Sequence, residues 1–300
     1  MKYIKLFEEF RPSDGVLPVK EITTDEFKSL LVENCSDFLT ILKSLDYNIN
    51  SDQLLFRKTN DIGNIVYSKP VSASHERLAP HSPVGNYHNL VLSNIDSWKE
   101  YPKRNKSICT SRLSRVKMSH GKVIYLVIPY NTTKIGVCPS MDMWYAFKRL
   151  TIFKVSSGNP KFDYDSPGLL VNWFRGIIDV VEAKAGHKIN DTKWEELKPY
   201  LDQKYNEFGN KKYTQKRVSI DGSEPKTIYF PDYDKNLTLL ENLNRVLDPT
   251  LNDFSIKYLK DLPEIFSKES NECWFEDDCL MIKHDLIKDK SKEELIELFG

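Results

Sequence analysis

Segments with the pattern of β-strands stand near both ends of this chain, and helix-like segments fill the region between them. The early strand-like segments cover residues 53–58, 64–69, 106–111, 122–129 and 133–137, and a late one covers 272–283. From about residue 141 to about residue 262, apolar residues recur mainly with the helical period. A late strand can bury its apolar side chains by joining a sheet that already exists. The order therefore predicts an α+β fold in which the C-terminal strands return to the first sheet, with a long helical insertion over residues 141–262.

The first 18 residues are expected to form a leader and linker. The segment 1–10, MKYIKLFEEF, places its apolar residues on one helical face, at Tyr3, Ile4, Phe7 and Phe10. Two prolines and a glycine follow within residues 11–18, which is typical of a linker. A docking helix on a tether and a helix folded back on the domain both fit this pattern. Residues 19–300 are then expected to form one domain.

Several short signals predict where helices begin and end. Thr24 precedes a helical segment, and Thr192 with Glu195 and Ser291 with Glu294 have the spacing of capping boxes. Gly186 follows an apolar helical run over residues 168–186. The polar, turn-rich region 210–234 is expected to be a loop.

The charge balance limits the class of protein. Lysines and arginines number 43, and so do aspartates and glutamates. A net charge of zero argues against a protein that mainly coats nucleic acid or an anionic membrane. A nucleic-acid enzyme nevertheless stays one hypothesis, because the chain has a local basic run. A solvated surface is the simpler interpretation of this run, which consists of Lys103, Arg104, Lys106, Arg112, Arg115 and Lys117. No apolar run approaches the roughly 20 residues of a membrane span, so no membrane association is expected.

The cysteines and histidines predict no metal site. The five cysteines are scattered without a C-x-x-C pair, and the six histidines do not cluster. Thiols without disulfides suit a reducing compartment.

The segment 106–115, KSICTSRLSR, ends a predicted strand with two hydroxyl residues, Thr110 and Ser111. Hydroxyls at a strand end can face a ligand, or they can cap the short helix that follows. Because side chains alternate along a strand, Ile108 and Thr110 should share one face, with Cys109 and Ser111 on the other. We expect Cys109 to face the core and the Thr110 hydroxyl to face a cleft.

Three elements, taken together, resemble the arginine–serine–glutamate class of ADP-ribosyltransferases. They are Arg57 in LLFRK, the segment SICTS over residues 107–111, and Glu272 in SNECWF. The resemblance implies a mixed or antiparallel split-sheet core and NAD as the substrate. It also implies that Glu272 is the catalytic residue and that the cofactor-binding residues are Arg57, Ser107, Thr110 and Ser111.

The chemistry of this family gives each position a reason. A planar guanidinium, here Arg57, can hold two oxygens of the NAD⁺ diphosphate. Loss of nicotinamide passes through an oxocarbenium-like state, which the Glu272 carboxylate would stabilise. Each residue also has a simpler interpretation: a solvated edge arginine, a strand or helix cap, and an exposed strand glutamate.

The chain departs from the family pattern in two respects: the gap from Ser111 to Glu272 is longer than compact members of the family need, and one position near the glutamate differs. The family usually has an acidic or amide residue two positions before its catalytic glutamate, and Ser270 stands there in this chain. Transfer of ADP-ribose and hydrolysis of NAD⁺ therefore both remain open. Asp142 in CPSMDMW is a competing third element, with a helix N-terminal charge as its simpler interpretation.

The segment 1–10 resembles the leaders of internal and capsid-associated proteins of large tailed bacteriophages. This resemblance implies a phage protein that binds the capsid or scaffold through residues 1–10 and acts in the host cytoplasm, after packaging in the virion or early synthesis. Its target would be a host protein or nucleic acid. The alternative is a non-catalytic head or internal structural protein.

Overall fold

The computed structural model describes residues 19–69, 86–119, 121–143, 146–147, 150–156, 159–162, 169–208, 212–214, 226–230, 232–266 and 271–300. The predicted leader and linker, residues 1–18, lie outside this part of the chain. The chain divides into two compact units. The first contains Met1–Leu78, Tyr101–Met141 and Ser255–Gly300, and the second contains Ala79–Glu100 and Asp142–Phe254. The second unit overlaps the expected insertion and also takes in a segment that precedes it.

The first unit contains a five-stranded antiparallel sheet. Its strand order is β1 (Val19–Glu21), β3 (Ile65–Ser68), β13 (Cys279–Lys283), β5 (Val123–Pro129) and β2 (Phe56–Thr59). Met281 of β13 lies opposite Val66 on one side and Val127 on the other. Residues Cys279 to Ile282 are buried, as expected for a strand in the middle of a sheet. The C-terminal strand therefore returns to the first sheet, and the predicted α+β class is confirmed.

A second antiparallel sheet in the same unit has four short strands. Their order is β11 (Ser255–Lys257), β6 (Ile135–Val137), β12 (Cys273–Phe275) and β4 (Ile108–Thr110). One bridge links the two sheets: the Phe56 amide donates to the Ser111 carbonyl at 2.8 Å, and the Ser111 amide donates to the Phe56 carbonyl at 2.9 Å. Strands β2, β4 and β12 are thereby neighbours, although they are far apart in sequence.

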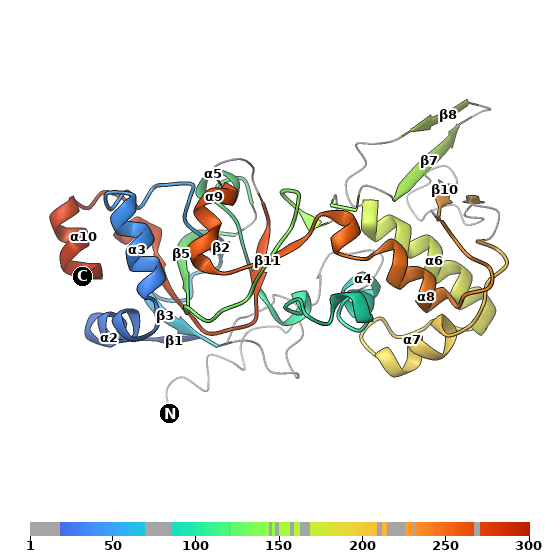
Figure 1. Cartoon of the computed structure of the whole chain (residues 1–300), viewed down its shortest axis with the longest axis horizontal. Helices are drawn as coiled ribbons and strands as arrows, with labels where there is room; N and C mark the ends of the chain where they lie inside the picture. The colour runs from blue at the N-terminus through green and yellow to red at the C-terminus, as the bar shows by residue number, and fades with distance from the viewer. Residues whose placement is uncertain are drawn as a thin grey trace. The chain divides into compact units, whose positions relative to one another are not determined.

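Helices from both ends of the chain pack together in the first unit. Its helices are α2 (Thr24–Asn34), α3 (Ser36–Ser44), α5 (Leu113–Val116), α9 (Leu262–Phe266) and α10 (Lys292–Phe299). Helices α2 and α10 lie side by side (Figure 1), where the Phe299 ring packs 5.8 Å from that of Phe27 and 5.7 Å from that of Phe38. The capping box of Ser291 and Glu294 is present as predicted, whereas Thr23 rather than Thr24 caps α2.

The second unit combines helices with a sheet that the sequence did not indicate. Its helices are α4 (Tyr87–Leu92), α6 (Leu169–Ala185), α7 (Trp194–Leu201) and α8 (Leu239–Val246). Its sheet has the order β8 (Asn159–Phe162), β7 (Thr151–Ser156), β10 (Lys226–Tyr229) and β9 (Lys212–Thr214). The expected loop over residues 210–234 thus contains two strands. Strands of three and four residues are too short for alternation to reveal them.

One predicted helix start in the second unit is wrong. Helix α7 begins at Trp194 with Lys193 as its N-cap, and no side chain caps it. The Thr192 hydroxyl instead donates to the Asn190 side chain at 2.8 Å, a local turn that competes with capping. The end of α6 agrees with its prediction, because Gly186 follows the helix with φ of 77°, a conformation that favours glycine.

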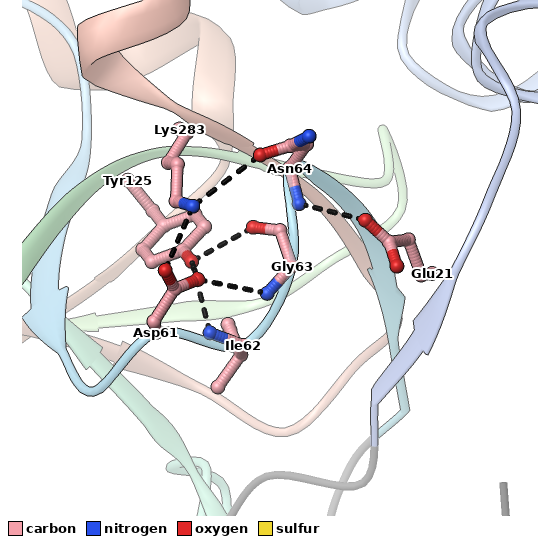
Figure 2. Close-up of polar contacts among 7 residues, drawn as sticks. All are labelled: Glu21, Asp61, Ile62, Gly63, Asn64, Tyr125 and Lys283. Atoms are coloured by element: carbon pink, nitrogen blue, oxygen red, sulfur yellow. Dashed lines mark hydrogen bonds and ion pairs between the residues drawn. The ribbon is translucent and has the colours of Figure 1, made fainter.

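The connection from β2 to β3 passes the ends of β5 and β13, and a polar cluster holds it there (Figure 2). The Tyr125 hydroxyl donates to the Gly63 carbonyl at 2.8 Å, and the Lys283 ammonium contacts Asp61 at 2.9 Å. The hydrogen bond from Lys283 holds the pKa of Asp61 below the ordinary value. Burial raises the pKa of Tyr125 to about 12. These contacts stay within the turn and its neighbouring strands, so the cluster is a structural anchor.

Candidate functional site

The four-stranded sheet of the first unit has two unlike faces. The core side carries apolar residues at Ile108, Ile135, Val137, Cys273 and Phe275. Because side chains alternate, Glu272 and Trp274 of the β12 segment point to the other face. Glu272 directly precedes β12 and lies on this second face, which is the candidate site.

Residues 101–107 lie against this face. The Trp274 ring nitrogen donates to the Pro102 carbonyl at 2.7 Å, and the Lys103 amide donates to the Glu276 carboxylate. The Trp274 ring also lies directly against Gly136, where an added Cβ would stand 2.4 Å from the ring atom Cε2. Only a glycine on β6 leaves room for the indole in this position.

Glu272 is held by a buried ion pair with Arg104, from the 3₁₀ turn Arg104–Lys106. Both Nε and Nη2 of Arg104 lie 2.8 Å from Oε1 of Glu272. The two side chains are only 13% and 10% exposed. The Glu272 amide also donates to the Ser140 carbonyl at 3.1 Å, and its carbonyl accepts from the Cys138 amide at 2.9 Å. The carboxylate is therefore a fixed anion rather than the exposed strand glutamate of the simpler interpretation.

The two predicted hydroxyls bind the backbone on either side of Glu272. The Ser111 hydroxyl donates to the Asn271 carbonyl at 3.1 Å, and the Thr110 hydroxyl donates to the Cys273 carbonyl at 3.3 Å. Cys273 lies opposite Thr110, so the antiparallel register continues with Glu272 opposite Ser111 and on the same face. The helix-cap interpretation of Ser111 is wrong, because Arg112 is the N-cap residue of α5.

The side chains of β4 face the opposite way from the prediction. Ile108 and Thr110 do share a face, but that face is the core, and Thr110 is 4% exposed. Cys109, which the sequence pattern predicts in the core, is half-buried on the opposite face. A threonine can enter a core when a backbone carbonyl accepts its hydroxyl, as the Cys273 carbonyl does here.

Arg57 and Ser107 occupy different places around the site. The Arg57 guanidinium donates from Nη1 to the Cys109 carbonyl of β4 at 3.1 Å, and its side chain is half-buried. The Ser107 hydroxyl donates to the Lys103 carbonyl at 2.8 Å and so stabilises the turn that carries Arg104. The structure thus places Arg57 in β2, Ser111 at the end of β4 and Glu272 at the start of β12, and it gives Ser107 a contact within its own turn.

Sequence alone does not identify Arg104 as the partner of Glu272. Arg104 belongs to the basic run, and nothing in the spacing of these two residues, 168 positions apart, links them. Asp142, the competing third element, lies in a bend of the second unit and outside the described strands and helices. Cys273 is no nucleophile, because burial raises the pKa of its thiol well above the ordinary value.

The second unit contains a depression. Its volume is 470 Å³, and its lining includes Asp96, Asp232, Arg245 and Asp248. Asp248 is engaged in a local turn, because its carboxylate accepts from the Thr250 amide at 2.8 Å. None of the residues predicted from the sequence lies there.

Two further findings concern metals and membranes. Within the described ranges, no three or more histidine, cysteine or acidic side chains gather in a way that would hold a metal ion. Among the same residues, no helix combines the length and the apolar character needed to cross a membrane.

The chain matches no protein family model, no curated protein sequence and no solved structure. The proposed function therefore rests on the geometry around Glu272.

Proposed function

We propose that the chain is an NAD⁺-dependent mono-ADP-ribosyltransferase with Glu272 as its catalytic carboxylate. The observation that supports this most is the meeting of strands β2, β4 and β12. Arg57 lies in β2, Ser111 directly follows β4 and Glu272 directly precedes β12, in the order that the family resemblance implies. The Arg57 guanidinium donates to the Cys109 carbonyl, and the Ser111 hydroxyl donates to the Asn271 carbonyl beside Glu272.

The ion pair with Arg104 fixes the position of the carboxylate. Breaking the bond between nicotinamide and ribose develops positive charge on the ribose, and a fixed anion stabilises that charge without reorganising. Arg104 holds Glu272 with two contacts to one oxygen, both at 2.8 Å. Arg104 is thus a positioning residue, and Glu272 is the group that would contact the ribose.

The other predicted residues take revised roles. Ser111 positions Glu272 through the Asn271 carbonyl and lies on the same face, where a ribose hydroxyl would bind. Arg57 stands on the adjoining strand, and its planar guanidinium suits the NAD⁺ diphosphate. Thr110 points into the core and is left to a structural role.

The acceptor is proposed to be a host protein or nucleic acid in the host cytoplasm. Residues 1–10 are proposed to bind the phage capsid or scaffold, with packaging in the virion as the consequence. Hydrolysis of NAD⁺ is the same reaction with water as the acceptor.

The test is incubation of the chain with labelled NAD⁺ and host lysate. The unchanged chain should transfer label, Glu272→Gln should lose the transfer, and the matched change Asp142→Asn should retain it. Circular dichroism of each variant separates lost chemistry from lost folding. If the folded wild-type chain neither transfers label nor releases nicotinamide, the proposal is wrong and a non-catalytic structural protein is the better hypothesis.

A further inference from the structure

We infer that the first unit binds nucleic acid through a basic surface formed by Lys58, Arg115, Lys117 and Lys122. Its residues come from β2, from α5 and the turn after it, and from the segment that leads into β5. The Lys58 ammonium donates to the Lys117 carbonyl at 3.2 Å, and the Lys122 amide donates to the Thr59 carbonyl at 2.9 Å. These contacts place the elements beside one another, so the charges form one surface.

The charges of this basic surface are not neutralised by nearby acids. Asp61 is paired with Lys283 at 2.9 Å, and Asp285 with Lys288 at 2.8 Å. Asp52 lies 4.0 Å from Arg112 and also accepts from the Ser114 amide at 2.8 Å. Within the described part of the chain, no carboxylate forms an ion pair with any of the four basic residues. The chain as a whole has a net charge of zero, so this concentration of positive charge is local.

This surface shares Arg115 and Lys117 with the basic run seen in the sequence, but its other members differ. Arg104 belongs to that run, but its guanidinium is engaged in the ion pair with Glu272 and its side chain is only 13% exposed. Lys58 and Lys122 did not belong to it, and the fold adds them. The fold therefore joins part of the charged segment to two lysines from other segments.

The chemistry of the surface fits a nucleic acid strand. Lys117 and Lys122 are exposed, and Met118 between them is 73% exposed. Cations spread over three elements suit a chain of regularly spaced phosphates, and an exposed apolar side chain among them suits the face of a base. The surface also adjoins the candidate site. Helix α5 begins two positions after Ser111. Lys58 stands two positions after Phe56, which is the bridge partner of Ser111.

The salt dependence of binding gives a quantitative expectation. Four basic residues that each neutralise one phosphate of a single strand give a slope of about −2.8 for the logarithm of the association constant against the logarithm of salt concentration. Affinity should then fall about 50-fold between about 50 and 200 mM salt. The probe is a fluorescein-labelled single-stranded DNA of about 20 nucleotides, read by fluorescence anisotropy without NAD⁺.

Charge reversal localises the binding. Lys117→Glu combined with Lys122→Glu should weaken binding at least tenfold and make the salt slope shallower. The matched control combines Lys43→Glu with Lys260→Glu, two exposed positions of the same unit, and should change binding less than twofold. Circular dichroism confirms that both variants fold.

Three results would overturn the inference: no binding by the folded wild-type chain, equal losses in the two double variants, or polyglutamate bound as tightly as the DNA at the same salt. The inference does not depend on the transferase reaction. Binding is measured without NAD⁺, and labelled-NAD⁺ transfer is measured separately, so either proposal can fail alone.

Discussion

Replacing Arg104 with methionine should destabilise the candidate sheet strongly, because it removes the guanidinium that pairs with the Glu272 carboxylate at a position with little solvent exposure. Both contacts of the ion pair are 2.8 Å, and the side chains are 13% and 10% exposed. Removing one member of a pair that is this deeply buried typically costs about 3–5 kcal/mol. Methionine keeps most of the volume of the arginine stem, so the loss reports on charge and hydrogen bonding rather than on a cavity.

A double variant that removes both charges tests whether the ion pair itself causes the loss. Arg104→Met combined with Glu272→Leu removes both charges and leaves no buried ion behind. Replacing a whole buried pair with apolar residues is often close to neutral, so the double variant should recover most of the loss. The two single losses should therefore sum to more than the loss of the double variant, which a double-mutant cycle measures directly.

Hydrogen exchange of the β4 and β12 amides in the native state is the appropriate assay. The chain has two compact units, so global unfolding need not be a single transition, whereas exchange at these amides reports on this sheet alone. Lys20→Met is the control, because it breaks the Lys20–Glu26 pair, whose side chains are 65% and 47% exposed, and it should leave exchange at β4 and β12 unchanged. A loss below about 1 kcal/mol in Arg104→Met, the scale of an exposed pair, would refute the claim that Glu272 is a fixed, buried anion.

Three further changes test neighbouring parts of the account. Gly136→Ala should destabilise the sheet by about 1–3 kcal/mol by forcing the Trp274 ring to move, as urea unfolding would show. Burial lowers the pKa of His284 below its ordinary value of 6.5, so the unfolded chain takes up this proton more readily than the folded chain. The stability that the neutral His284 contributes to the folded state should be complete above pH 6.5 and should be lost as the pH falls towards the lowered pKa. His284→Gln should therefore flatten the pH dependence of thermal stability in that range. Ser111→Ala should lower transferase turnover, whereas Thr110→Val, on the core face, should lower stability without lowering turnover; equal turnover in the two variants would contradict the assignment of the faces.

Features set by local pattern or by long apolar runs could be predicted from this sequence. Strand β5 contains five consecutive buried residues, and its apolar run has the length of a buried strand. The box of Ser291 and Glu294 is a local interaction of four residues and does not depend on the rest of the fold. The box of Thr192 and Glu195 failed because Asn190 offered a competing local acceptor for the same hydroxyl.

Features set by tertiary contacts could not be predicted. The strands of the sheet in the second unit are three to six residues long, and pairing between distant segments decides whether such strands form. The direction of the β4 faces depends on which side the helices and the other sheet cover, and alternation alone cannot supply that. The Arg104–Glu272 pair is likewise created only when residues 101–107 lie against β12.

A crystal structure of the Glu272→Gln variant with bound NAD⁺ tests the central claim most directly, because the substitution keeps the shape of the side chain and should prevent turnover. We predict that a hydroxyl of the nicotinamide ribose lies within about 3 Å of the residue 272 side chain. We also predict the diphosphate on the side of Arg57. NAD⁺ bound instead in the second-unit depression beside Asp96 and Arg245, or bound nowhere in crystals of a correctly folded chain, would contradict the account.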